Sequence, residues 1–239
     1  MNSVFYFSGS GHSRAVADLF SARLNTSAYD ICKYRKSRPD LPAAETAVIV
    51  FPVYSENIPS PVKLFLKELS AQKAVLIATY GRVSHGNVLW EAKKLVKSVI
   101  IAAAYVPAGH TFLDEKNEAN KKISFDVCAL EDIFKRISER SPISAVITRE
   151  KKHPLASVFP NLRSRLGVKI SLSGNCLRCN LCGEVCPVGA IKQGKTNSKC
   201  IRCLKCVKTC PKSALSYRPR KVLLHYLKSH RVDRLKIYL

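Results

Sequence analysis

The feature that most constrains this chain is a duplicated cysteine motif near its C-terminus. Residues 176–187 read CLRCNLCGEVCP and residues 200–211 read CIRCLKCVKTCP, so the pattern C-x2-C-x2-C-x3-C-P occurs twice. The shift that superimposes the two runs also maps Ala190 onto Ala214. The segment is therefore an internal duplication, and eight thiols in so short a stretch require a chemical explanation.

Thiolates at this spacing suit iron–sulfur clusters, because two-residue spacers let one tight loop supply three ligands to one cluster. The fourth cysteine of each run, followed by Pro, ligates the other cluster. We therefore expect two [4Fe–4S] clusters with interleaved ligands. The expected ligands are Cys176, Cys179, Cys182 and Cys210 for one cluster, and Cys200, Cys203, Cys206 and Cys186 for the other.

Zinc is the alternative, because two C-x2-C pairs can build a tetrahedral site with four thiolates. Such a site needs neither a third cysteine two residues further on nor the Cys-Pro ending. The N-terminus, MNSVFYFSGSGHSR, lacks the features of a signal peptide, so we expect a cytoplasmic protein, in which dense cysteines more often bind metal than form disulfides. Residues 172–216 resemble a bacterial-type ferredoxin domain with two [4Fe–4S] clusters. Lone Cys32 and Cys128 are given no role.

The first 150 residues alternate between apolar runs typical of strands and amphipathic helical patterns. Runs such as AVIVF and AVLIA suit strands that are covered on both faces. A doubly wound α/β domain with a five-stranded parallel sheet is therefore expected, with ligands at the carboxyl ends of its strands. The expected strands are 4–7, 28–34, 46–51, 74–79 and 103–108, and the expected helices are one following the 8–14 loop, then 61–69, 87–100 and 125–138.

Three loops would meet at those strand ends, and the first of them, SGSGHS, joins a strand to a helix. Such a Gly/Ser loop can cradle a phosphate, although it can also be an ordinary β–α turn. The loop resembles the phosphate loop of flavodoxins, and the other two loops resemble those that hold the flavin ring there, with Tyr54 and Tyr80 in position to stack on it. Tyr54 could equally cap the sheet edge, and His12 and His85 suit solvated loop positions. The resemblance implies FMN, bound by Ser8, Ser10, Gly11, His12, Ser13, Pro52, Val53, Tyr54, Thr79, Tyr80, Gly81 and Asn87.

The whole chain resembles fusion proteins that join a flavodoxin-like domain to a two-cluster ferredoxin, known as EFR-type ferredoxins. The expected organisation is a flavodoxin-like FMN-binding domain over residues 1–145, a linker over 146–171, a small α+β ferredoxin-like domain over 172–216 and a basic tail over 217–239. In the tail, Leu224, Leu227, Leu235 and Tyr238 would line one face of a helix. That helix would pack on the body, or contact a membrane surface or a partner protein.

Charge is unevenly placed along the chain. Residues 151–239 carry 20 Lys and Arg against 2 acidic residues, whereas residues 1–150 carry 20 against 15. A surface this basic attracts acidic partners, and we expect an acidic redox protein. Nucleic acid is not expected, because no nucleic-acid-binding motif accompanies the charge.

The resemblance implies an electron-transfer protein that passes electrons between FMN, two [4Fe–4S] clusters and external redox partners. Two alternatives remain at this stage. One is a flavin-dependent reductase of a small substrate that is fed by the clusters, and the other is a basic nucleic-acid-binding protein with structural clusters. Whether the protein is an enzyme is left open, with an electron carrier preferred over a substrate-specific oxidoreductase.

Overall fold

A six-stranded sheet forms the body of the protein. The computed structural model describes residues 1–33, 44–113, 127–158 and 160–239. The strands lie in the order β10-β5-β4-β3-β1-β2, and all neighbours are parallel except β10, which runs antiparallel to β5. Without β10 the order is 2-1-3-4-5, which is the flavodoxin-like arrangement of a doubly wound sheet. The strands are β1 (Asn2–Tyr6), β2 (Ala28–Asp30), β3 (Ala44–Pro52), β4 (Ala71–Tyr80), β5 (Val99–Pro107) and β10 (Lys236–Tyr238).

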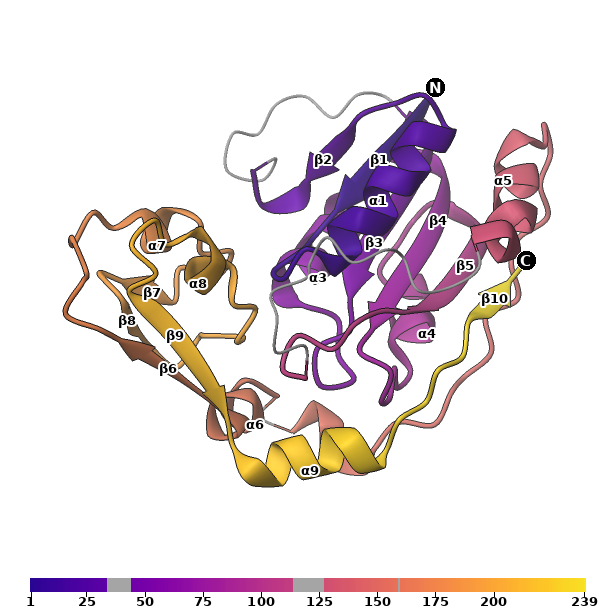
Figure 1. Ribbon diagram of the computed structural model, residues 1–239. Coiled ribbons are helices and arrows are strands. Elements are labelled where there is room, and N and C mark those ends of the chain that lie inside the picture. Colours follow the sequence, from indigo (N-terminus) through magenta and orange to yellow (C-terminus); the bar gives the residue numbers. More distant parts are fainter. Residues whose placement is uncertain (34–43, 114–126, 159) are drawn as a thin grey trace.

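Helices cover both faces of this sheet (Figure 1). On one face, α1 (His12–Arg23) and α5 (Glu131–Ser138) share a core in which Phe20 and Phe134 lie with ring centroids 4.9 Å apart. On the other face, α3 (Ser60–Glu68) and α4 (Val88–Lys93) pack through residues such as Phe65 and Leu89. Because both faces are covered, β3 is continuously apolar from Ala47 to Phe51 and β4 from Ala74 to Ala78, as expected for central parallel strands.

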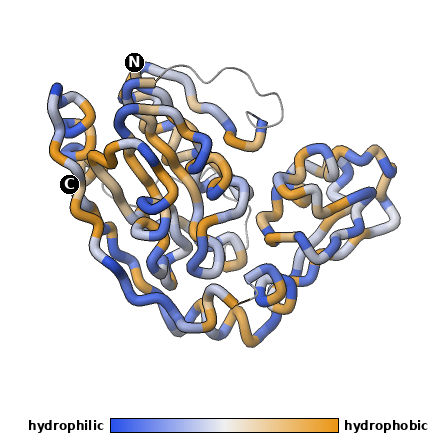
Figure 2. Tube along the Cα trace, turned by 180° about the vertical axis from the view of Figure 1, so that it is seen from behind, coloured by the Kyte–Doolittle hydropathy of each residue, from blue (hydrophilic) through white to orange (hydrophobic). Residues whose placement is uncertain are grey.

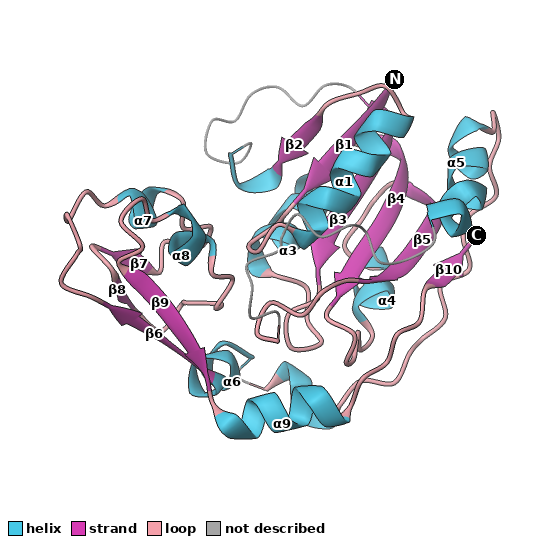
Figure 3. Cartoon of the chain, viewed as in Figure 1, coloured by secondary structure: helices cyan, strands magenta, loops and turns pink. Residues whose placement is uncertain are grey.

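The cysteine-rich segment forms a separate small unit beside the sheet (Figures 1 and 3). Its two longer strands pair antiparallel with each other. Two short helices and a short hairpin lie between these strands in the sequence. Its core is small: Ile191, Cys206 and Leu215 are buried in it, and Cys182 and Cys186 pack against them. The elements are β6 (Val168–Leu172), α7 (Leu181–Glu184), β7 (Ile191–Lys192), β8 (Lys195–Thr196), α8 (Lys205–Thr209) and β9 (Leu215–Pro219).

The chain connects the two units through one helical segment on each side. Before the small unit lie a 3-10 turn, η2 (Pro154–Ser157), and the helix α6 (Pro160–Gly167). After it, α9 (Lys221–Ser229) leads back to β10 on the edge of the large sheet. In Figure 2 hydrophobic residues concentrate in the strands of the sheet, whereas the connecting segments carry long hydrophilic stretches.

The tail therefore differs from the single helix expected from the sequence. Leu224 and Leu227 lie in α9, but Leu235 and Tyr238 belong to the β10 segment instead. Tyr238 is 6% exposed and packs into the core of the large sheet. The physical reason is that β5 would otherwise present an unpaired edge, and a strand from the C-terminus covers it.

Most other elements lie where they were expected, and the exceptions are local. The helix expected over 87–100 ends at Lys93, because the β-branched run from Val99 begins β5 earlier than expected. The strand expected over 28–34 ends at Asp30, and its last position, Tyr34, lies outside the described residues. Before α5 the chain forms the 3-10 turn η1 (Val127–Leu130), and the first two residues of the helix expected over 125–138 are likewise outside the described part. In the part of the chain that the structure describes, no helix combines the length and apolar character needed to cross a membrane.

Candidate functional site

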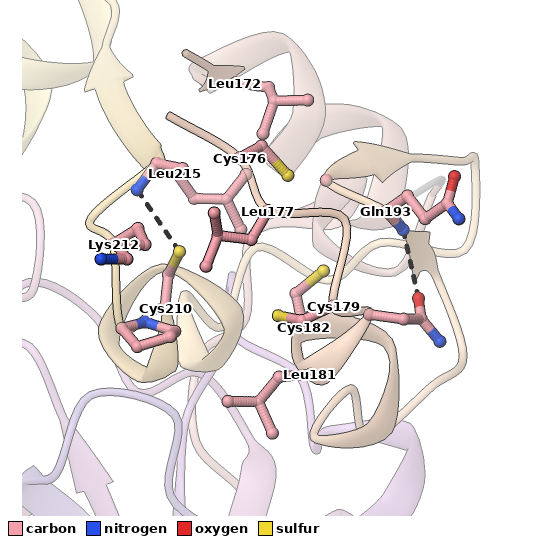
Figure 4. A pocket seen from close by; sticks show the side chains of 14 residues that line it. Leu172, Cys176, Leu177, Cys179, Leu181, Cys182, Gln193, Cys210, Lys212 and Leu215 are labelled. Carbon is pink, nitrogen blue, oxygen red and sulfur yellow. Dashed lines mark hydrogen bonds between the residues drawn. The ribbon is translucent and has the colours of Figure 1, made fainter. Parts of the chain in front are cut away.

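The eight cysteines of the duplicated motif gather around two small cavities. One cavity is lined by Cys176, Cys179, Cys182 and Cys210, here called the outer cysteine group. Figure 4 shows Cys210 approaching this space from the α8–β9 side, while the other three come from the 176–182 segment. The second cavity is lined by Cys186, Cys200, Cys203 and Cys206, here called the inner cysteine group. Each group thus takes three residues from one run and the fourth from the other, which is the grouping that interleaved clusters require.

The duplication is also visible in the backbone. Arg178 and Asn180 have φ of +54° and +59°, and their counterparts Arg202 and Leu204 have +54° and +60°. Non-glycine residues adopt this left-handed conformation only at some cost, so its repetition indicates that both loops are bent for the same purpose. Each bend lets three cysteine side chains of one run face a common space.

Solvent reaches the two groups differently. Cys179 is exposed in the outer group, and Leu177 beside it is 64% exposed. In the inner group Cys200 and Cys206 are buried. Burial raises the pKa of Cys203 to about 12 and that of Cys206 to about 11. These thiols hold their protons at neutral pH until a metal displaces them, so metal binding releases protons.

Backbone N–H groups donate to the two crossing cysteines at equivalent positions. Ala190 N lies 3.1 Å from the sulfur of Cys186, and Ala214 N lies 3.3 Å from the sulfur of Cys210. Such hydrogen bonds stabilise a thiolate and help to tune a cluster's potential. Within the described ranges, no three His, Cys, Asp or Glu side chains converge closely enough to share a single metal ion. In a cluster each thiolate binds a different iron, so its ligands lie further apart.

A much larger cavity, of about 400 Å³, opens at the carboxyl ends of the parallel strands. It lies beside the switch point between β1 and β3, where doubly wound sheets bind their ligands. The volume is within the range of cofactor pockets. The three predicted loops supply one side of it, with Ser10, His12, Ser13, Pro52, Val53, Tyr54, Thr79, Tyr80 and Gly81 among its lining residues.

Three predicted residues do not line this cavity. Ser8 accepts a hydrogen bond from Gly11 N over 3.0 Å, so both residues shape the loop from within. Gly11 has a φ of +104°, which favours glycine, and α1 begins directly after it without a side-chain cap. Asn87 is buried away from the cavity, and its side-chain oxygen accepts from Glu150 N over 2.9 Å.

The two predicted aromatic residues have different surroundings. Tyr54 is half-buried, its ring meets Phe7 edge-on, and its hydroxyl lies against Gly9. Burial, followed by the nearby Cys203, holds the pKa of Tyr54 well above its usual value. Tyr80 is almost fully buried, and its hydroxyl is bound by the C-terminal segment at Arg234. His85, expected in solvent, stacks on Tyr105 with ring centroids 3.7 Å apart.

The remaining walls of the cavity come from segments that local sequence patterns did not reveal. The 108–112 loop after β5 contributes His110, which sits so close to Gly81 that a side chain there would overlap it. From α6 come Arg163 and Ser164, and from α9 come Leu223, Tyr226 and Leu227. The small unit contributes Val168, Ile201, Arg202 and Cys203. Cys203 therefore belongs both to the inner cysteine group and to the wall of the large cavity.

The comparisons with known proteins agree with the cysteine geometry. Residues 150–229 match the family model of a 4Fe-4S dicluster domain, which supports iron–sulfur clusters in this part of the chain. The matched range includes all eight cysteines together with α6 and α9.

Among solved structures, the chain matches the crystal structure of a Bacteroides uniformis protein that is provisionally described as a flavoprotein. The identity is 16%, the match covers 46% of this chain and 91% of that one, and the TM-score is 0.34. No curated protein matches the chain.

Proposed function

We propose that this protein transfers electrons between a flavin in the large cavity, two [4Fe–4S] clusters in the cysteine groups and external redox partners. The observation that carries the proposal is the position of Cys203, which lines both the large cavity and the inner cysteine space. The two cavities share the wall residues Ile201 and Cys203, so electrons could pass between the cofactors inside one chain.

FMN is the flavin that the residues of the cavity fit. The loop after β1 offers the hydroxyl of Ser10, the imidazole of His12 and the first N–H groups of α1, a donor set that suits a phosphate. Val53 and Tyr54 after β3 and Gly81 after β4 would border the ring system. FMN, when bound, supplies the exchange of electron pairs for single electrons, whereas the clusters supply single-electron transfer.

The positions of the two cysteine groups suggest a path for electrons through the small unit, from the large cavity to the surface. The inner group lies against the cavity, and the outer group lies towards solvent beside the exposed side chain of Leu177. Electrons that enter or leave the protein by contact with another protein would therefore pass at the outer group.

An acidic redox protein is the proposed partner. The segment that carries both cysteine groups has 20 Lys and Arg against 2 acidic residues, and Glu184 and Asp233 are those two. Such a surface raises association rates with acidic proteins, and the rates fall as salt increases. Reduction of an acidic ferredoxin should slow by at least tenfold between low and physiological salt, whereas reduction of a basic c-type cytochrome should not.

The proposed function is tested first by composition. Protein purified without oxygen should contain about eight iron atoms, about eight labile sulfides and one FMN per chain, and should take up about four electrons in a reductive titration. Zinc in place of iron, or a preparation without flavin, would contradict the proposal.

A second candidate function is reduction of a small substrate at the flavin. One observation favours it: the cavity extends beyond the three flavin loops to Arg163 of α6 and Tyr226 of α9, which would cover the site. This alternative predicts that Tyr226→Ala impairs turnover of a small acceptor without changing electron uptake by the clusters. In a pure carrier the substitution would leave all electron transfer rates close to those of the unmodified protein.

A further inference from the structure

Gly9 lies where the small unit touches the first loop of the flavodoxin-like sheet. A Cβ atom at this position would overlap the carbonyl oxygen of Cys203, and it would lie 2.8 Å from the Cβ of Cys203 and 2.8 Å from the hydroxyl of Tyr54. Real Cβ atoms do not approach other atoms so closely, and a backbone carbonyl cannot move aside as a flexible side chain can. Only glycine fits between these two neighbours.

Two lysines of α8 hold the same contact from the side. The ammonium group of Lys205 lies 2.8 Å from the carboxylate of Asp30, whose side chain is 8% exposed. The ammonium group of Lys208 donates to the carbonyl oxygen of Ser10 over 2.6 Å. Both lysines lie within the second cysteine run, on either side of Cys206, so α8 is anchored to the sheet at the first loop and at β2.

We infer that Gly9 is a positioning residue that seats the Cys203 loop on the phosphate loop and thereby holds the inner cysteine group against the flavin cavity. The inference rests on the proposed function, because it assigns the contact through which the two cofactor sites are kept at a fixed separation. Gly9 also lines the large cavity, beside Ser10 and Tyr54. It acts by leaving room for the peptide of Cys203, and Lys205 and Lys208 keep that peptide in place.

The test compares Gly9→Ala with Gly174→Ala in the full chain, purified without oxygen. Gly174 is a matched control, because a Cβ there would meet nothing within 4 Å. Two quantities are measured on each protein: amide hydrogen exchange over residues 8–13 and 200–209, and the rate at which cluster absorbance responds after the flavin is reduced by light. One electron leaves the flavin for each cluster that is reduced.

Gly9→Ala should keep iron and FMN, exchange at least tenfold faster in both segments, and transfer electrons to the clusters at least tenfold more slowly, while Gly174→Ala matches the unmodified protein. Lys208→Gln, which removes one contact without a clash, should show the same changes at smaller size. If Gly9→Ala showed the same hydrogen-exchange rates and the same rate of electron transfer as the unmodified protein, the inference would be overturned. Absence of flavin or iron from the unmodified protein would instead overturn the proposed function.

Discussion

The hydroxyl of Tyr80 makes two hydrogen bonds to the backbone of a single residue, Arg234. It donates to the carbonyl oxygen over 2.7 Å and accepts from the N–H over 3.0 Å. Nearby, Val232 N donates to the carbonyl oxygen of Arg82, and the Arg82 side chain pairs with Asp233 at 3.2 Å. The segment after α9 is therefore bound to the loop that follows β4, which borders the large cavity.

Replacing Tyr80 by Phe should destabilise the protein measurably. The substitution keeps the ring but removes both hydrogen bonds, and it leaves the N–H and carbonyl groups of Arg234 without this partner. We expect a loss of about 1–3 kcal/mol in the free energy of unfolding, measured by urea denaturation of the cofactor-loaded protein. Tyr29→Phe is the control, since Tyr29 is 40% exposed, and it should change the value by less than about 0.5 kcal/mol.

Glu150 makes the attachment of β10 sensitive to acid. A hydrogen bond from Lys236, and another from the Tyr238 hydroxyl at 2.7 Å, hold the pKa of Glu150 below its ordinary value of 4.5. Because the pKa is lower in the folded state, the stabilisation is present above about pH 4.5 and is lost as the pH falls through the folded pKa. Unmodified protein should therefore lose more stability than Glu150→Gln on acidification through this range. The difference in melting temperature between the two proteins, followed against pH, measures the effect. Acid also removes clusters, but this loss affects both proteins equally and does not change the difference. Parallel pH curves would contradict the prediction.

Removing the cation–anion contact at Asp30 should loosen the small unit. Asp30→Asn leaves Lys205 facing a neutral amide at a partly buried position, so we expect the contact to weaken by about 1–2 kcal/mol. Hydrogen exchange in α8 reports the change as faster exchange, while the central strands keep their protection. As a control, Glu45→Gln removes the distant ion pair of Glu45 with Lys73 and should have no effect on α8.

Paired cysteine substitutions separate interleaved clusters from clusters built within one run. Cys182→Ala with Cys210→Ala removes two ligands from the outer group, so about four iron atoms per chain should remain. Cys182→Ala with Cys186→Ala removes one ligand from each group, so little iron should remain. Cys128→Ala, outside the motif, should keep about eight. If the two double variants held iron in the reverse order, each cluster would be built within one run.

The sequence was most informative where function depends on local spacing. The two cysteine runs predicted two groups, each with three cysteines from one run and one from the other. The two small cavities are lined by these same groups. The assignment of the cysteines as cluster ligands stays a prediction. Apolar runs such as that from Ala47 to Phe51 indicated buried parallel strands, and β3 and β4 are buried accordingly. These signals are local because the loop geometry of C-x2-C and the two-sided burial of a strand depend on neighbouring residues.

Contacts between distant segments left no such signal. Gly9 and Cys203 are far apart in sequence, and a glycine in a Gly/Ser loop does not indicate which backbone approaches it. The position of Asn87 in the loop after β4 predicted a contact with the flavin. Its side chain instead accepts a hydrogen bond from the backbone N–H of Glu150. The apolar residues Leu235 and Tyr238 fit a helical pattern. The segment forms a strand instead, because it pairs with Ala103 to Tyr105 of β5. Tertiary pairing outweighs local preference in a segment this short.

The return of the C-terminus to β5 means that the cysteine-rich unit has two points of attachment to the body, one through α6 and one through α9 and β10. A module on one tether can swivel and must search for its docked orientation, whereas a module fixed at both ends has far less rotational freedom to lose. These two connections therefore disfavour large movements of the cysteine-rich unit between separate docking positions. Under the proposed function, any movement needed for electron delivery would be that of the external partner.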